Sequence, residues 1–276
     1  MPPKTSSYRA WADRLAAYEC TDAGLDSAAW DDVSATGSAR LPRKKPEATI
    51  PRVADLATLA FELDAEATTA LLATTARLGV TMESVIVTAL AVALTRDGGE
   101  DRLLVYLERH GRESVGGDID VSRTVGWFTA VFPVCVRLAP SRRPYDTLLD
   151  VDRRLRMIPQ GGIGWALQQD PRPIEDDGEV VERPELSCNY LGRVDPPAGL
   201  PWTVAPESAG PEVGPDGTRP TSLDVVGSVS EGRLRISWHY DTVAHDDATI
   251  ERLAARCVEL VRGFEMDAAS EERRRS

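Results

Sequence analysis

The chain lacks several features that would assign it to a class of protein at once. No apolar run approaches the length of a membrane span, and residues 1–4 lack the apolar segment of a signal peptide. Its 32 basic residues are outnumbered by 44 acidic ones, which gives a formal net charge of −12 without a local basic patch. Because such a surface repels phosphates, a nucleic-acid or membrane-surface role is not expected. We expect a cytoplasmic protein.

Cysteine and histidine are also scarce. The four cysteines are far apart and do not have the spacing of a metal site, so we expect small core residues in a reducing compartment. There are three histidines, and none is adjacent to another. His239 lies in an alternating pattern and His245 precedes a helix cap, so both are predicted to be structural. No metal site is expected. The cysteines are Cys20, Cys135, Cys188 and Cys257.

The length of 276 residues and the 42% content of hydrophobic residues are sufficient for a substantial core. Periodicity predicts helices that alternate with strands, and hence an α/β sandwich with a largely covered, mixed sheet. Residues 1–54 are predicted to be an N-terminal helix and a linker, 55–265 a folded lobe, and 266–276 a disordered tail. The stretch 195–220 is too long for an ordinary connection, which indicates a functional or mobile segment.

The expected elements have recognisable boundaries. Asp64 and Asp246 are in position to cap helices, Glu231-Gly232 is typical of a hairpin turn, and Pro133 indicates an edge strand or an irregular start of a strand. Strands are predicted near 61–63, 103–107, 132–138, 186–191, 223–229 and 234–240. Helices are predicted from residues 7, 64, 81, 145 and 246.

An ionisable cluster follows the apolar run 103–107. It reads Glu108-Arg109-His110-Gly111-Arg112-Glu113. Loops at the ends of strands often carry function, because the strand fixes the backbone while the loop approaches a ligand. The competing interpretation is a surface network of salt bridges.

The cluster is one of several motifs that resemble a known family in the family's order. Residues 108–113 resemble the Glu-Gly-His-Gly-Arg-Glu motif of epimerization domains in nonribosomal peptide synthetases. Residues 123–134 resemble Arg-Thr-Val-Gly-Trp-Phe-Thr-x-x-x-Pro-Val, 159–166 resemble Pro-x-x-Gly-x-Gly-Tyr-Gly, and 188–192 resemble Phe-Asn-Tyr-Leu-Gly. Residues 5–11 are similar to the segment that leads into the second half of such domains. The Glu-x-His-Gly-Arg run distinguishes them from the peptide-bond-forming members of the condensation-domain superfamily.

This resemblance implies one lobe of a two-lobed, chloramphenicol-acetyltransferase-like α/β fold. The family's N-terminal lobe carries His-His-x-x-x-Asp-Gly, which this sequence does not contain, and its active site lies between the lobes. The implied reaction removes and returns the α-proton of an aminoacyl or peptidyl thioester. The substrate is held on the phosphopantetheine arm of a peptidyl carrier protein, and no cofactor of the chain's own is implied.

Roles for individual residues follow from the same resemblance. Glu108 matches the catalytic glutamate, with its acid–base partner on the other lobe. Asn189 and Tyr190 match polar residues near the reaction centre that donate to the enolate oxygen. A further set is expected to organise the loop, line the substrate channel or pack between lobes: His110, Arg112, Trp127, Gly162 and Gly164.

Three departures from the family's motifs stand out. Arg109 and Ala166 each replace a glycine, and Cys188 replaces a phenylalanine. Arg109 puts close packing or substrate access beside Glu108 in question. The glycines that are kept are expected to serve turns with positive φ or close approaches.

Three functional hypotheses therefore remain open. The chain is a split epimerase lobe completed by a separate N-terminal lobe, a non-catalytic module that binds a carrier protein or another synthetase domain, or a remnant or fragment of a longer synthetase. An autonomous enzyme of new activity has no support beyond Glu108.

Overall fold

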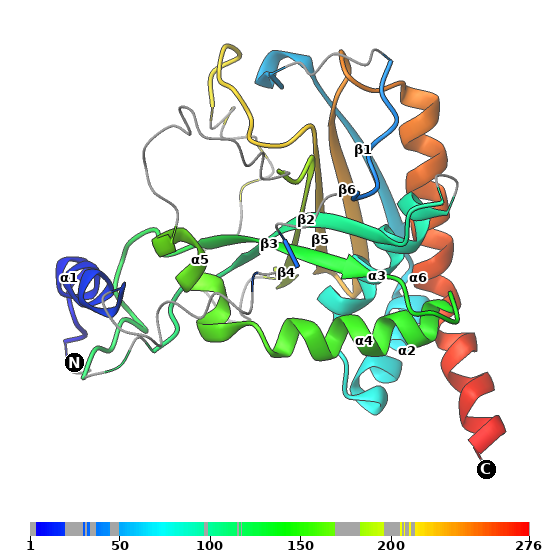
Figure 1. The fold of residues 1–276 in the computed structure, drawn as a ribbon, viewed down its shortest axis with the longest axis horizontal. Coiled ribbons are helices and arrows are strands. Elements are labelled where there is room, and N and C mark those ends of the chain that lie inside the picture. Colours follow the sequence, from blue (N-terminus) through cyan, green and yellow to red (C-terminus); the bar gives the residue numbers. More distant parts are fainter. Residues whose placement is uncertain are drawn as a thin grey trace.

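Six strands form one mixed sheet in the order β1-β6-β5-β4-β2-β3 (Figure 1). The β5–β4 and β4–β2 pairs are parallel and the other pairs are antiparallel. The computed structural model describes residues 4–19, 30, 32–33, 37–44, 50–96, 99–114, 116, 118–168, 183–195, 205, 207, 210 and 213–275. The strands are β1 (Leu56–Leu63), β2 (Arg102–Arg109), β3 (Ala130–Arg137), β4 (Leu186–Arg193), β5 (Leu223–Ser230) and β6 (Arg233–Asp241).

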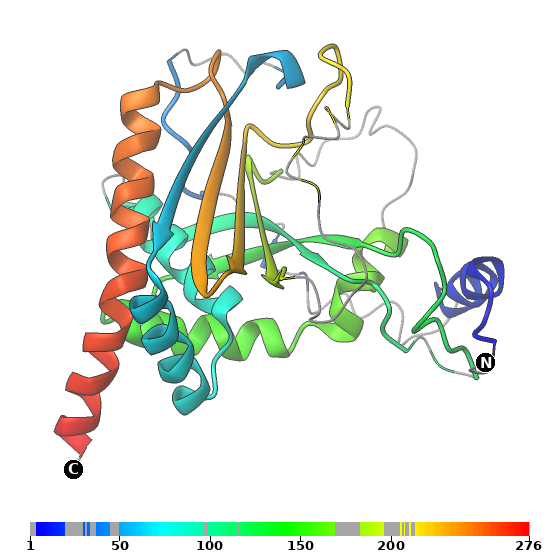
Figure 2. The same ribbon diagram turned by 180° about the vertical axis from the view of Figure 1, so that it is seen from behind.

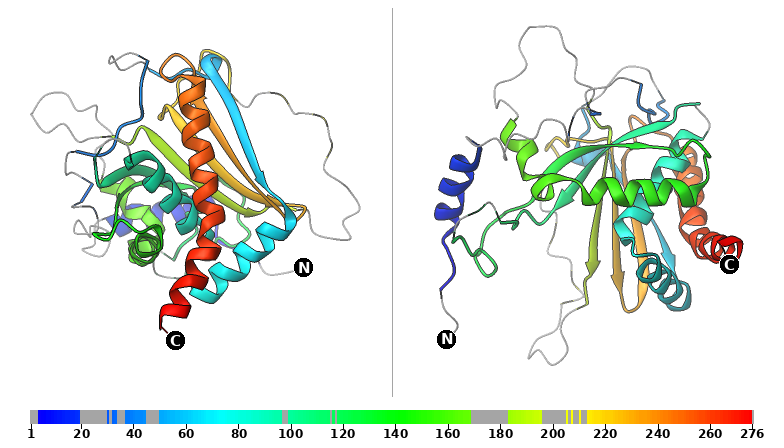
Figure 3. Two further views of the ribbon diagram at one scale, coloured as in Figure 1. Left: turned by 90° about the vertical axis from the view of Figure 1, so that its right-hand side faces the viewer. Right: turned by 60° about the horizontal axis from the view of Figure 1, so that its bottom comes forward.

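The longer helices cover one face of this sheet (Figures 2 and 3). Along β5 and β6, the residues that face these helices are buried, while most of their neighbours on the opposite face are partly or fully exposed. On β2 and β3 this opposite face is also largely buried, and it becomes more exposed where Glu108 and Val131 lie. We call it the open face of the sheet. The helices are α1 (Tyr8–Glu19), α2 (Ala65–Leu78), α3 (Met82–Thr95), α4 (Pro144–Arg156), α5 (Ile163–Gln168) and α6 (Asp247–Arg275), with short 3₁₀ helices η2 (Val53–Asp55) and η3 (Pro159–Gly162).

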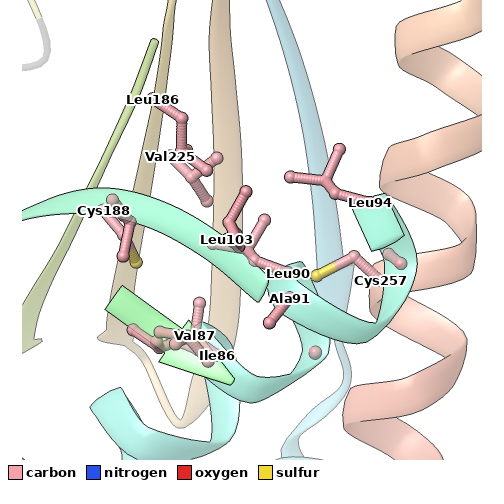
Figure 4. Packing of buried hydrophobic residues seen from close by; sticks show 14 of the residues in the cluster. Ile86, Val87, Leu90, Ala91, Leu94, Leu103, Leu186, Cys188, Val225 and Cys257 are labelled. Atoms are coloured by element: carbon pink, nitrogen blue, oxygen red, sulfur yellow. The ribbon is translucent and has the colours of Figure 1, made fainter. Parts of the chain in front are cut away.

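Buried residues of the central helix α3 pack between the sheet and α6 and form much of the core (Figure 4). Ile86 and Leu90 are fully buried, as are Cys188 on β4 and Cys257 on α6. Cys135 is buried as well, which agrees with the expectation of small core residues, while Cys20 lies outside the described residues. Truncating a residue such as Leu90 to alanine is expected to cost about 2–5 kcal/mol, because the closely packed surroundings cannot collapse into the space.

Local sequence signals correctly place the cap of α2, the turn between β5 and β6, and an edge strand. The Asp64 carboxylate accepts a hydrogen bond from the Ala67 amide at 2.9 Å, so it caps α2. Glu231 and Gly232 have φ values of 50° and 73°, as a tight hairpin turn with two left-handed residues requires. Pro133 lies in β3, which is an edge strand.

The N-terminal region is more integrated than a linker. Residues 38–41 enter the body of the lobe: the Ala39 amide donates to the Arg102 carbonyl at 2.9 Å, and the Leu104 amide donates to Ser38 Oγ at 2.7 Å. Leu41 is buried. The expectation of a surface linker was therefore wrong for these residues, because they satisfy backbone groups at the start of β2 where β4 does not pair with it.

Two further segments bear on the sequence predictions. The tail that was expected to be disordered continues α6 as helix through Arg275, which is consistent with its many alanine, glutamate and arginine residues. The long stretch 195–220 falls largely outside the described residues. In the part of the chain that the structure describes, no single helix passes a length-and-composition test for a membrane span, whereas α2 and α3 pass it only as a pair bent by 101°.

Candidate functional site

Glu108 lies on the open face of the sheet, near the end of β2. Its Oε2 accepts a hydrogen bond of 2.8 Å from Nδ2 of Asn189, which comes from the neighbouring strand β4. The pairing of Leu107 with Cys188 places the next residues, Glu108 and Asn189, side by side. Two residues from motifs 81 positions apart are thus brought into contact by the parallel pairing of β2 and β4.

The Glu108 carboxyl group is half-buried, and this burial raises its pKa above the ordinary value for glutamate. Desolvation is the larger effect because it disfavours the charged form, while the hydrogen bond from Asn189 opposes it. A carboxylate with a raised pKa is a stronger base than an exposed one. Among the described residues, Asn189 is the hydrogen-bond partner of this carboxylate, which leaves Oε1 available.

Tyr190 does not join this pair. Successive side chains of a strand point to opposite faces, so Tyr190 leaves β4 on the helix-covered face while Asn189 leaves it on the open face. Its ring packs against the hydrophobic core. A Cβ built on Gly227 would lie 3.2 Å from the Tyr190 ring and 2.7 Å from Ile86, which confirms the direction of the ring. The structure therefore does not place Tyr190 beside Glu108.

The loop after β2 is held by its own side chains. The Arg112 amide donates to Nδ1 of His110 at 3.0 Å, and Nε2 of His110 lies 3.5 Å from Oε1 of Glu113. The Arg112 guanidinium donates to the carbonyl oxygens of Val121 and Thr124. Arg112 thereby joins the start of the loop to its middle.

Phe128 completes the attachment of this loop. The Arg112 guanidinium carbon lies 4.0 Å from the centre of the Phe128 ring. Gly111 has a φ of 64°, and a Cβ at this position would come within 1.6 Å of the Phe128 carbonyl oxygen. Only glycine fits here without displacing the backbone of the returning segment, so Gly111 is required for both conformation and space.

The glycine-rich turn at 159–162 approaches β3 equally closely. Gly162 has a φ of 89°, and a Cβ there would overlap the Phe132 ring; a Cβ on Gly161 would overlap the Glu113 side chain. Both glycines therefore serve the backbone as expected. Gly164 lies inside α5, where the structure gives no comparable reason for glycine.

Trp127 is 80% exposed, so it does not contribute to a core within the described chain. Its backbone is nevertheless fixed, because the Tyr8 hydroxyl of α1 donates to the Trp127 carbonyl at 2.9 Å. Tyr8 and Trp11 also pack edge-on against Phe128. Helix α1 is thus fastened to the loop, beside which it lies at one end of the molecule (Figure 1).

Arg109 points away from Glu108, into the lobe. Its guanidinium lies 2.6 Å from a carboxylate oxygen of Glu83, in the first turn of α3. Glu83 is buried, and this burial raises its pKa despite the neighbouring arginine. This ion pair was not predicted from the sequence, although an arginine that replaces a glycine in the motif requires a partner for its charge when it is buried. The substitution does not obstruct the face that carries Glu108.

A cavity of about 790 Å³ lies elsewhere, between β3 and α4. Its arginines are already paired: Arg137 and Arg154 contact Asp32, and Arg153 contacts Asp150. The described residues include no group of three or more His, Cys, Asp or Glu side chains suited to a metal ion. We therefore locate the candidate site at Glu108, because its carboxylate and its contact with Asn189 suit acid–base chemistry, and not at the cavity between β3 and α4.

Comparison with known proteins places these features in a family. The model of the condensation domain matches residues 1–274. The chain belongs to the condensation-domain family. It is 36% identical over 281 residues to one of the linear gramicidin synthase proteins of Brevibacillus parabrevis, covering 98% of this chain and 4% of that protein. It is 34% identical over 269 residues to a chondramide synthase of Chondromyces crocatus, covering 95% and 7%.

Solved structures agree with this assignment. The epimerization domain from the third module of tyrocidine synthetase B superposes with a TM-score of 0.85 and 28% identity, covering 99% of this chain and 62% of that one. The X-domain from teicoplanin biosynthesis shares the fold, with a TM-score of 0.68 and 21% identity, covering 95% and 59%. The chain therefore has the condensation-type fold as a single lobe and spans less than two thirds of these relatives.

Proposed function

We propose that the chain is the C-terminal lobe of an epimerization domain. In this proposal it acts on an aminoacyl or peptidyl thioester carried by the phosphopantetheine arm of a peptidyl carrier protein. The observation that carries the proposal is the Glu108–Asn189 contact of 2.8 Å on the open face of the sheet. Residues 55–265 form the lobe proper, and α1 supports its loop.

The chemistry of this contact suits the removal of an α-proton. Burial raises the pKa of Glu108, which makes the carboxylate a better base, and the Asn189 amide fixes its orientation. Once the proton has left, the negative charge develops on the thioester oxygen, which needs a hydrogen-bond donor. Asn189 donates to Glu108 in this structure, so its first role is to position the base.

Inversion requires a second acid–base group on the opposite face of the planar carbanion. In the proposal this group comes from an N-terminal lobe with a His-His-x-x-x-Asp-Gly motif, placed over the open face of the sheet. The epimerization domain of tyrocidine synthetase B leaves room for such a second lobe, because this chain covers 62% of it.

A chimera tests the proposal directly. The part of the tyrocidine synthetase B domain that this chain does not cover is fused ahead of residue 1. The fusion is incubated in D₂O with an aminoacyl carrier protein, and deuterium at the α-carbon is measured by mass spectrometry. We expect α-deuteration together with formation of the opposite enantiomer.

Two variants make the outcome specific to Glu108. Glu108→Gln keeps the shape of the side chain and removes the base, and should slow exchange by about 10²-fold or more. Glu62→Gln alters an exposed carboxylate on the edge strand β1 and serves as the matched control. A folded chimera that binds the carrier without exchanging the proton would instead favour the non-catalytic, carrier-binding hypothesis. Undiminished exchange in Glu108→Gln would remove Glu108 from the mechanism.

A further inference from the structure

We infer that Val131 selects an apolar aminoacyl side chain for the reaction at Glu108. This inference rests on the proposed function and adds the class of substrate to it. It arises from the position of Val131 in β3, which pairs antiparallel with β2 so that Val131 lies directly opposite Glu108. Directly opposed residues project from the same face of a sheet, with Cβ atoms about 5 Å apart.

The exposure of Val131 sets it apart from its neighbours. Its side chain is 43% exposed, whereas Ala130 and Phe132 on either side are buried. Nearly half of this β-branched apolar side chain is therefore left uncovered by the described part of the lobe, on the open face of the sheet. It is therefore available to a molecule that lies over Glu108.

The other side of Glu108 is already occupied by a polar group. Asn189 on β4 holds Oε2 of the carboxylate at 2.8 Å. A substrate whose α-proton is to reach Glu108 consequently has its unobstructed approach from the β3 side. A substrate on that side has its α-carbon beside the Glu108 carboxylate. The amino acid side chain attached to this α-carbon is then long enough to reach Val131, the residue opposite Glu108.

Contact with Val131 favours apolar substrate side chains because of the free energy of removing surfaces from water. An apolar substituent removes the exposed surface of Val131 from water, whereas a polar one of the same size loses its own hydration without a partner. Apolar sites typically distinguish two ligands that differ in this way by about tenfold or more in affinity. We therefore expect a leucyl substrate to be preferred over an asparaginyl substrate of nearly the same shape.

The experiment measures binding, so it does not depend on turnover. L-leucyl and L-asparaginyl derivatives of pantetheine, in which an amide nitrogen replaces the thioester sulfur, are titrated calorimetrically into the chimera described above. Wild type should bind the leucyl analogue at least about tenfold more tightly. Val131→Thr keeps the shape and the β-branching and should reduce the ratio to about threefold or less, while thermal denaturation verifies the fold.

Val243→Thr is the matched control. Val243 is 46% exposed and lies in the turn that follows β6, which is separated from β3 by three strands of the sheet. This variant should leave the ratio unchanged. Equal affinities in wild type, or a ratio that Val131→Thr does not alter, would overturn the inference.

α-Deuteration of the corresponding carrier-bound substrates separates this inference from the proposed function. Exchange without a preference between leucyl and asparaginyl substrates refutes the role of Val131 and leaves the epimerase assignment standing. Absence of both binding and exchange refutes both. A Val131→Thr variant that weakens attachment of the N-terminal lobe without changing the ratio would show that the lobe, and not the substrate, covers Val131.

Discussion

Replacing Arg109 by methionine is expected to destabilise the lobe in a pH-dependent manner. Methionine keeps the apolar stem and removes the charge that lies 2.6 Å from Glu83. Arg109 is the group that lowers the pKa of Glu83, against desolvation and the nearby charge of Asp152, so its loss raises that pKa further. Glu83 must then either remain charged without a partner or take up a proton.

The magnitude follows from the burial of the two partners. Removing one member of a fully buried ion pair costs about 3–5 kcal/mol, and exposed pairs contribute less than about 1 kcal/mol. Glu83 is buried, but the Arg109 side chain is 32% exposed, so the pair lies nearer to the buried limit without reaching it. We expect a loss of about 2–3 kcal/mol at pH 7, and a fall of about 4–12 °C in melting temperature.

The sign of the pH dependence is fixed by Glu83. An acid whose folded pKa is raised destabilises the fold at pH values above its unfolded pKa, because only the unfolded state ionises freely. The deficit of Arg109→Met relative to wild type should therefore be greatest near pH 7 and should shrink as the pH falls towards about 4.5. Urea denaturation followed by far-UV circular dichroism at the two pH values measures it.

Two comparisons test the reasoning. Adding Glu83→Gln to Arg109→Met removes the stranded charge and should restore more than half of the lost stability. Arg235→Met breaks a comparable pair with Glu62 at 3.0 Å, in which both side chains are about half exposed, and should cost less than about 1 kcal/mol. If the loss in Arg109→Met were independent of pH, or no larger than in Arg235→Met, the charge of Glu83 would not be its cause.

Three further predictions concern single positions. Gly111→Ala should cost at least about 2 kcal/mol and increase hydrogen exchange of the loop, because its φ of 64° is unfavourable and its Cβ overlaps the Phe128 carbonyl; unchanged exchange would contradict this. Burial lowers the pKa of His245, so stability should fall as pH drops below about 6.5, by at most about 1.4 kcal/mol per pH unit. His245→Gln should remove that part of the slope in urea titrations. Asp64→Ala should cost about 1 kcal/mol in thermal denaturation through loss of the α2 cap, and Glu66→Ala distinctly less.

Local elements of this protein were predictable because their signals are local. The cap at Asp64, the turn at Glu231 and the edge strand with Pro133 each depend on the conformational preference of a few adjacent residues. The helical stripe of α3 identified the core for the same reason, since periodicity shows which residues must be shielded from water. The ordered motifs indicated an epimerization domain of the condensation-domain superfamily, and the comparisons established the condensation-domain family.

Which residues meet at the site could not be predicted from the sequence, because it depends on how strands distant along the chain pair in the sheet. Glu108 was a candidate from the sequence, but its contact with Asn189 requires β2 and β4 to be parallel neighbours with a fixed register. The same register sends Tyr190 to the opposite face, because side-chain direction alternates along a strand and a motif of adjacent residues does not reveal which face each one takes.

The sequence by itself determined the six strands, five of the helices, the α/β class and the candidate base. Only the tertiary structure decided that Arg109 turns inward to Glu83, that residues 38–41 enter the lobe, and that Val131 stands opposite Glu108. These outcomes join residues that are distant along the chain, so they depend on strand order, register and burial. Such properties belong to the assembled sheet and its helices, and no local propensity specifies them.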